Sequence, residues 1–242
     1  MNKFKVLNSL TGLVEELETE SNLITWYMCG PTVYNDSHIG HARNYISNDI
    51  IRRILNNYGY NVYQTMNITD IDDKIINKAE ETLGDKKHFS KIAVDYEKSF
   101  FEDMIKLNVQ MPDIVTRVSQ YMPEIINFIT DLVNKGYVYN PENTSSVYFD
   151  YDKYSEKYED YFNIKANKPM SEDFIDEKKN VKDFVLWKQA KINEPFWDSP
   201  WVVTRSVQPC FAREMDALDG TLNVLQCLQI FLAKKLQCIL EE

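Results

Sequence analysis

The chain has 242 residues, 44% of them hydrophobic and 26% charged, a composition typical of globular proteins and not of disordered or fibrous ones. No apolar stretch approaches the length that spans a bilayer, so no membrane partner is expected. The net charge of −10 excludes a whole-protein electrostatic footprint for nucleic acid. The four cysteines show no CxxC pairing and no dense secreted pattern, which favours a reduced, cytoplasmic location.

The first half of the chain predicts alternating strands and helices. Residues 24–29 are suited to a buried strand, and isoleucines at helical spacing then predict a helix from Gly40 that stops at Gly59. Residues 61–67 alternate like a second strand, and residues 71–83 predict a second helix. Strand, helix, strand and helix at short spacing predict a parallel α/β sheet, in which ligands collect beyond the carboxyl ends of the strands.

The second half predicts shorter elements. Helices are expected at 89–107 and 122–135, and strands at 138–139, 147–149 and 184–188, the first two strands forming a hairpin. Residues 150–180 are rich in Tyr, Asp, Glu and Lys with little apolar periodicity. That stretch predicts mobile surface structure without regular elements.

The most informative run is residues 29–43, Cys-Gly-Pro-Thr-Val-Tyr-Asn-Asp-Ser-His-Ile-Gly-His-Ala-Arg. A His-Ile-Gly-His tetrapeptide at a helix start, after a strand and a Gly-Pro turn, predicts a nucleotide site. The first turn of a helix offers unpaired N–H groups and a partial positive charge to phosphate. Cys29 ends the first predicted strand and Thr69 follows the second, so both are expected to face one crevice.

A second motif, Asn-Ile-Thr-Asp-Ile-Asp-Asp-Lys, occupies residues 67–74. Its simplest interpretation is an N-cap, in which Thr69 or Asp70 satisfies the first N–H groups of the next helix. Capping and ligand contact are compatible, so the motif supports both interpretations.

These motifs, with Asp-Phe-Val-Leu-Trp-Lys at 183–188 and Trp-Asp-Ser-Pro-Trp at 197–201, resemble those of the cysteinyl-tRNA synthetases, a class I aminoacyl-tRNA synthetase family. The resemblance covers residues 1–201. It implies the first half of a Rossmann-like nucleotide-binding domain at 1–115, with an incomplete parallel sheet, and a helix-rich connective insertion at 116–201.

The resemblance also implies roles for individual residues. His38 and His41 would be catalytic, contacting the phosphates of ATP, which binds with Mg, and stabilising charge on them. The ATP site would comprise Thr32, His38, Gly40 and His41, and the cysteine site would comprise Cys29, Gly30, Thr69 and Trp201. Cys29 would be the first ligand of a zinc ion that binds the substrate thiolate and so rejects serine. For Trp201 ordinary core packing is an equal alternative.

The resemblance ends after Trp201. The second zinc cysteine, the later His-His-Glu-Asn-Glu segment, the Lys-Met-Ser-Lys-Ser loop and the anticodon-binding domain have no counterpart. Cys210, Cys227 and Cys238 are an alternative set of ligands, but their spacing does not match a structural site. We therefore expect an incomplete zinc site and a truncated, impaired form of the enzyme.

Residues 202–242 form a divergent tail. Back-translation of residues 219–242 with degenerate codons, read in a shifted frame, can encode Trp-His-Ile-Glu-Cys-Ser-Ala-Met, which is the missing family segment. We expect this part of the tail to be out of frame. The alternative is an amphipathic helix whose leucines recur at spacings of three and four.

The expected function is ATP-dependent activation of cysteine to cysteinyl-adenylate and its transfer to tRNA(Cys), which makes cysteine, ATP and tRNA(Cys) the expected partners. One alternative is a cysteine ligase acting on an amino-sugar in low-molecular-weight thiol synthesis. Another is a non-catalytic truncated paralogue that binds nucleotide, tRNA or a partner protein. A folding-defective fragment with an exposed sheet edge is the remaining one.

Overall fold

The computed structural model describes residues 4–8, 11–17, 19, 21–141, 146–158, 178–180, 182–191, 193–200 and 207–209. The predictions for Trp201, and those for the tail at 202–242 apart from one short strand, lie outside the described residues. None of the described helices is both long and apolar enough to cross a membrane.

The elements run in the following chain order: β1 (Lys5–Leu7), β2 (Val14–Glu16), β3 (Leu23–Met28), α1 (Ile39–Asn57), β4 (Asn61–Ile68), α2 (Asp73–Leu83), η1 (Lys86–His88), α3 (Phe89–Lys106), β5 (Ile114–Arg117), η2 (Val118–Gln120), α4 (Met122–Asn134), β6 (Val138–Tyr139), β7 (Val147–Phe149), α5 (Tyr151–Tyr158), β8 (Phe184–Gln189) and β9 (Val207–Pro209).

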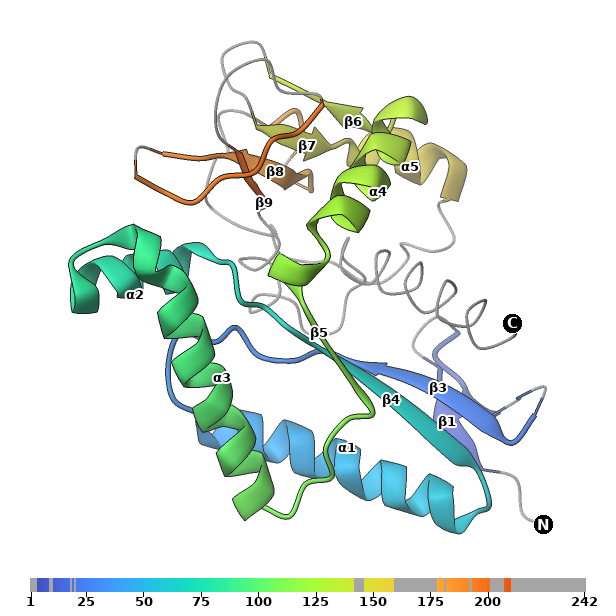
Figure 1. Cartoon of the computed structure of the whole chain (residues 1–242). Helices are drawn as coiled ribbons and strands as arrows, with labels where there is room; N and C mark the ends of the chain where they lie inside the picture. The colour runs from blue at the N-terminus through green and yellow to red at the C-terminus, as the bar shows by residue number, and fades with distance from the viewer. Residues whose placement is uncertain are drawn as a thin grey trace.

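A parallel sheet with the order β3-β4-β5 is the centre of the lower lobe in Figure 1. Leu23 pairs with Asn61 and Met28 with Met66, so β3 and β4 stay in register along the whole length of β3. Helical crossovers join the strands, as parallel pairing requires. The predicted α/β class, the two strands and the intervening helices are therefore confirmed.

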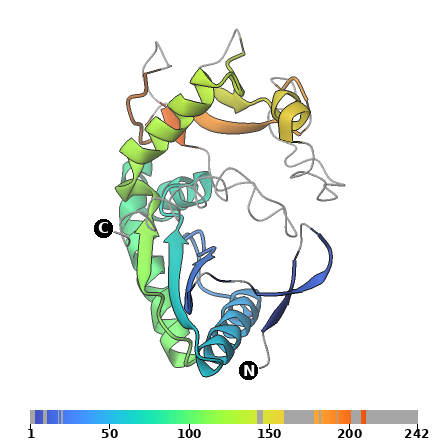
Figure 2. The ribbon, with the colours of Figure 1, turned by 90° about the vertical axis from the view of Figure 1, so that its right-hand side faces the viewer.

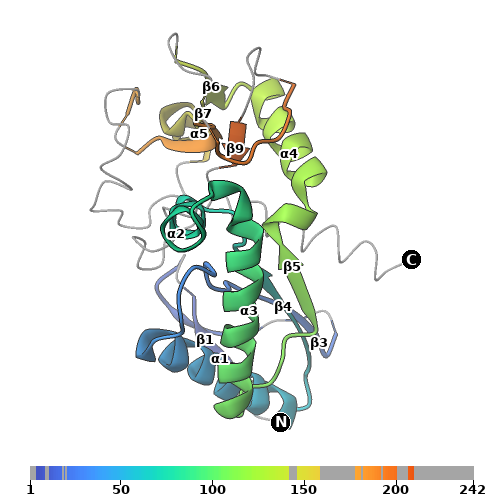
Figure 3. The ribbon, with the colours of Figure 1, turned by 60° about the vertical axis from the view of Figure 1, so that its left-hand side comes forward.

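Helices α1 and α3 pack on the same face of this sheet (Figures 1 and 3). The ring of Tyr45 from α1 meets the edge of Phe100 from α3, with centroids 5.1 Å apart. Both rings are buried in one apolar cluster with Met28, Met66 and Ile68 of the sheet. This cluster holds the ends of β3 and β4 in fixed positions, and those ends lead into the predicted motifs.

Three strands of the first half, β1, β2 and β5, were not predicted. Strand β5 has four residues, including Thr116 and Arg117, and it becomes a strand because it pairs with β4. The antiparallel hairpin β1-β2 turns at Gly12, whose φ of +71° is accessible to glycine. In each case pairing with a neighbour, and not a pattern within the segment, decides the conformation.

The insertion lobe, defined here as the described residues from 118 onward, lies beyond the carboxyl ends of the parallel strands (Figures 1 and 2). It contains α4, α5 and an antiparallel sheet with the order β6-β7-β8-β9. The predicted hairpin at 138–149 is confirmed. The prediction of no regular structure from residue 150 is wrong for α5, because Asp150 caps that helix through the amide of Lys153 at 3.1 Å.

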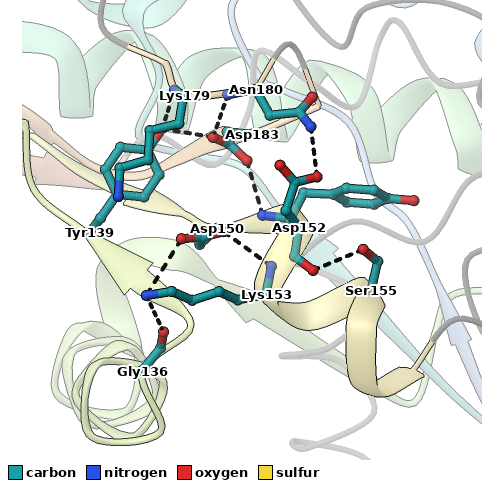
Figure 4. A network of polar contacts seen from close by, with 10 residues as sticks. Gly136, Tyr139, Asp150, Asp152, Lys153, Ser155, Lys179, Asn180 and Asp183 are labelled. Carbon is teal, nitrogen blue, oxygen red and sulfur yellow. Dashed lines mark hydrogen bonds and ion pairs between the residues drawn. The ribbon is translucent and has the colours of Figure 1, made fainter.

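Asp183, which is buried, anchors the start of β8 (Figure 4). Its carboxylate accepts hydrogen bonds from the Tyr151 amide at 2.9 Å, the Asn180 amide at 2.9 Å and the Tyr139 hydroxyl at 2.8 Å. Burial, together with the charge of Asp183, raises the pKa of Tyr139, which keeps the phenol protonated as a donor. The strand that follows is therefore fixed at its first residue.

Candidate active site

The loop that leaves β3 lies across the carboxyl end of β4. The Thr69 amide donates to the Pro31 carbonyl at 3.1 Å, and the Val33 amide donates to the Thr69 carbonyl at 3.2 Å. Thr32 and Thr69 form a parallel bridge beyond the strands proper. The segments that carry Cys29 and Thr69 are thus brought together, as their positions after neighbouring strands predicted.

The side chain of Asn67 joins this loop to β4 through hydrogen bonds. Its side-chain oxygen accepts a hydrogen bond from the Gly30 amide at 2.9 Å and another from the Tyr27 hydroxyl at 2.5 Å, while its Nδ2 donates to Thr69 Oγ1 at 3.4 Å. Asn67 opens the second motif, but sequence reasoning did not assign it to the site. Its signal was its position at the end of a strand, where a buried amide is rare unless it bonds the neighbouring loop.

Gly30 lies against backbone and not against open space. A Cβ at this position would be 1.6 Å from the carbonyl oxygen of Asn67 and 2.9 Å from Met66 Cγ. Any side chain would therefore separate the loop from β4. This steric requirement explains a glycine here, and the predicted contact of Gly30 with substrate cysteine stays a prediction.

The two motif histidines cap helix α1 reciprocally. His38 Nδ1 accepts from the Gly40 amide at 3.0 Å and from the His41 amide at 3.3 Å, and His41 Nδ1 accepts from the His38 amide at 3.3 Å. The rings stack with centroids 3.8 Å apart and planes 15° from parallel. This is a capping box built from two imidazoles.

The expectation that the first turn of α1 offers unpaired N–H groups to phosphate is wrong for two of its amides. Gly40 N and His41 N are already bonded to the His38 ring, because a nearby side chain competes with an external ligand for the same donors. The cap has a second consequence. Since each Nδ1 accepts, each neutral ring carries its proton on Nε2, which makes both rings Nε2–H donors.

Gly40 is required by the same cap. A Cβ there would lie 2.8 Å from Cε1 and 2.9 Å from Nδ1 of the His38 ring. The glycine leaves room for the capping imidazole, and its predicted contact with ATP stays a prediction.

Tyr45 connects helix α1 to the loop that carries Cys29, hereafter the Cys29 loop. The sequence analysis did not predict this role. Its hydroxyl donates to the Cys29 carbonyl at 3.1 Å, and its ring centroid is 6.5 Å from that of His41, one helical turn earlier. Burial raises the pKa of Tyr45, and the charge of Cys29 adds to the effect. The phenol therefore stays protonated as a hydrogen-bond donor. The spacing of four residues from His41 was the available signal.

The three aspartates of the second motif, Asp70, Asp72 and Asp73, have different roles. Asp72, and not the predicted Thr69 or Asp70, caps α2, accepting from the Lys74 amide at 2.6 Å. The helix begins at Asp73, two residues later than predicted, because Asp72 is extended and Ile71 is buried in the insertion lobe's core. Asp70 instead accepts hydrogen bonds from the amide and hydroxyl of Ser119.

The predicted metal ligand Cys29 belongs to no metal-binding cluster within the part of the chain that the structure describes. No group of three or more His, Cys, Asp or Glu side chains arranged to hold a metal ion occurs among the described residues. Trp201, the last predicted member of the cysteine site, lies outside them.

The cap by itself predicts a change in stability. We expect His38→Ala to lower the free energy of unfolding by about 1 kcal/mol, because two first-turn amides lose their acceptor. His38→Asn should recover most of this loss, since asparagine is a good N-cap residue. Urea denaturation of the three proteins checks the expectation. Equal stability of the wild-type protein and the Ala variant would show that the His38 ring contributes nothing as a cap.

Comparison with known proteins gives consistent relatives. The family described as tRNA synthetases class I (C) catalytic domain matches residues 15–212. The "Cysteine--tRNA ligase, cytoplasmic" of Dictyostelium discoideum is 42% identical over 237 residues, covering 90% of this chain and 35% of its own length. The "Cysteine--tRNA ligase" of Staphylothermus marinus is 44% identical over 205 residues, covering 83% of this chain and 42% of its own.

Among solved structures, the ternary complex of Agrobacterium radiobacter K84 agnB2 LeuRS with tRNA and LeuAMS aligns with a TM-score of 0.42 and 25% identity, over 52% of this chain and 16% of that one.

Proposed function

The chain belongs to the family of class I (C) tRNA synthetase catalytic domains, and we propose that it serves the ATP-dependent activation of cysteine and its transfer to tRNA(Cys). The proposal reaches beyond the family because the relatives named Cysteine--tRNA ligase are 42% and 44% identical to this chain. The chain spans about 35% and 42% of the length of these two relatives. Activation and transfer by the whole protein are therefore part of the proposal.

The observation that carries the proposal is the stacked pair of imidazoles beside the loop that lies across β4. In activation, a carboxylate oxygen of cysteine attacks the α-phosphorus of ATP, the bond to the β-phosphate bridging oxygen breaks, and pyrophosphate leaves. Negative charge develops on the phosphate oxygens during this step. The two Nε2–H donors of His38 and His41 can stabilise that charge, because their orientation is set beforehand by the cap.

The remaining predicted contacts belong to the same proposal. Thr32 and Gly40 flank the phosphate side, and Cys29, Gly30 and Thr69 flank the cysteine side, with Trp201 proposed from the motif alone. Thr69 is buried and its backbone is bonded on both sides to the Cys29 loop, which gives it a defined position. We also propose that Mg binds together with ATP, as the counter-ion of the phosphates.

Zinc does not fit the described residues. Cys29 supplies one sulfur, and no group of three or more His, Cys, Asp or Glu side chains that could hold a metal ion occurs in the described part of the chain. A four-ligand site would need side chains from outside that part. No step of the proposed reaction runs through a metal, and zinc stays a prediction from the resemblance. A cytoplasmic location is proposed because the Dictyostelium relative is named cytoplasmic.

Binding of ATP to the 242-residue chain, measured by isothermal titration calorimetry, is the first test. We expect binding, and we expect His41→Ala to weaken it by about 10-fold to 100-fold, the value of one hydrogen bond to a charged group. His88→Ala is the matched control, because His88 is exposed on η1 and contributes nothing to the capping box.

Exchange of labelled pyrophosphate into ATP then tests activation. Exchange that depends on cysteine and not on serine supports the proposed reaction. Binding of ATP without exchange selects the alternative of a non-catalytic paralogue. A chain that folds but binds no ATP contradicts the proposal.

A further inference from the structure

Helix α2 is held at both ends by ion pairs with the insertion lobe. At its first residue, Asp73 pairs with Lys188 of β8. Just past its last turn, Lys86 Nζ lies 3.3 Å from Glu194 Oε1. The side chains in these pairs are 6%, 19%, 17% and 5% exposed for Lys188, Asp73, Lys86 and Glu194, so neither pair is an ordinary surface contact.

The chemistry of both pairs indicates specific contacts. A lysine near a helix N-terminus opposes the positive end of the helix dipole, so Lys188 is stabilised there by the carboxylate of Asp73 and not by the helix. At the other end, burial alone would lower the pKa of Lys86, but hydrogen bonds and charges from Glu194 and Glu80 raise it. Each lysine thus bonds a carboxylate more than 100 residues away in sequence.

The residues before Asp73 connect this helix to the candidate site. Ile71 is buried in the cluster that contains Trp187, the neighbour of Lys188 on β8. Asp70 is bonded to Ser119 at the start of the insertion lobe. Thr69, the next residue back, bonds the loop at Pro31 and Val33 that leads from Cys29 to His38. Residues 69–73 thus link β8 to the loop that carries Cys29 through a continuous series of contacts.

β8 itself is anchored independently of α2. Asp183 fixes its first end through three hydrogen bonds from Tyr139, Tyr151 and Asn180 (Figure 4). Along its length β8 pairs with β7 from Phe184 to Trp187, and its last three residues, Lys188 among them, pair with β9. Lys188 therefore reaches Asp73 from a strand that is paired on both sides and bonded at its start.

We propose that Lys188 and Asp73 are positioning residues of the active site, and that their ion pair sets the location of Thr69 and the Cys29 loop relative to helix α1. The catalytic meaning of the proposal rests on the proposed function. Its mechanical content, the coupling of the insertion lobe to the loop, does not. Neither residue touches the reacting atoms, so each acts through the Thr69–Asp73 segment.

Hydrogen exchange of individual amides in the 242-residue chain tests the coupling. We expect Lys188→Met to speed exchange at the Thr69 and Val33 amides by about tenfold relative to the amides that pair β3 with β4. The amides between β3 and β4 are the internal reference, because a loss of global stability would speed exchange at both sets equally. Lys188→Arg keeps the positive charge, so its Thr69 and Val33 amides should exchange as slowly as those of the wild-type chain. Lys91→Met is the matched control, since Lys91 pairs with Asp95 on the exposed side of α3.

Asp73→Asn is the second variant and keeps the hydrogen-bond acceptor without the charge. Asp73→Asn should also speed exchange at the Thr69 and Val33 amides, but by a smaller factor. It replaces Lys188→Met in the test if Lys188→Met fails to fold. Unchanged exchange at Thr69 and Val33 in the variant that folds overturns the proposal, as does failure of Lys188→Arg to restore protection. Both results are independent of ligand binding.

Calorimetry with ATP separates the two proposals. If the wild-type chain binds no ATP but Lys188→Met loosens the Thr69 amide, the proposed function fails and the coupling stands. If the wild-type chain binds ATP and exchanges pyrophosphate, Lys188→Met should lower the exchange rate at saturating substrates with little change in the KM for ATP. A change in that KM alone would contradict a positioning role.

Discussion

Gly30→Ala is expected to lower the free energy of unfolding by about 4 kcal/mol or more, placing it among the most damaging single substitutions. The added Cβ would lie 1.6 Å from the carbonyl oxygen of Asn67. The position of the Cβ is fixed by the backbone of residue 30, and the oxygen it meets belongs to the backbone of Asn67, so no side-chain rotation relieves the clash. The Cys29 loop must separate from β4, which also breaks the bond from the Gly30 amide to Asn67. Chemical denaturation measures the loss.

A matched glycine shows what the substitution costs without a clash. Gly59 follows α1 with a φ of +91° and open space where a Cβ would lie. Gly59→Ala should cost only about 1–2 kcal/mol, the strain of a left-handed alanine. If Gly30→Ala were no more harmful than Gly59→Ala, the close approach of the loop to β4 would be wrong.

Asp113→Ala is expected to cost about 3 kcal/mol or more, because it leaves a buried guanidinium without its counter-charge. Arg52 of α1 is 8% exposed and bonds Asp113 Oδ2 at 2.7 Å, the Met111 carbonyl at 2.9 Å and Gln64 Oε1 at 3.3 Å. Asp113 Oδ2 also accepts from the Gln64 amide at 2.7 Å. The group joins α1, β4 and the segment before β5.

Two further variants isolate the cause of that loss. Asp95→Ala removes a carboxylate whose partner Lys91 is 62% exposed, and it should change stability by less than about 0.5 kcal/mol. The double variant Arg52→Met/Asp113→Ala removes both charges and should recover part of the loss. Equal stability of the single and double variants would mean that the unpaired charge of Arg52 is not the source of the cost.

Local patterns in the sequence predicted most elements of the parallel sheet. Isoleucine spacing located α1, alternation located β4, and Gly59 marked the end of the helix, because these signals are read within one segment. The elements that were missed have a different origin. β5 and the β1-β2 hairpin are three to four residues per strand, and α5 depends on a cap from Asp150. Such short elements exist because a neighbour completes their hydrogen bonds.

The candidate site shows the same division. The order of residues determined that Cys29 and Thr69 follow adjacent strands and that His38 and His41 begin a helix, because chain direction in a parallel sheet places these ends at one edge. Only the tertiary structure decided that the histidines cap each other, that Asp72 and not Asp70 caps α2, and that Tyr45 and Asn67 hold the loop. It alone also joined Lys188 to Asp73 across 115 residues. Those contacts depend on distances between segments remote in sequence, which packing fixes and local patterns do not record.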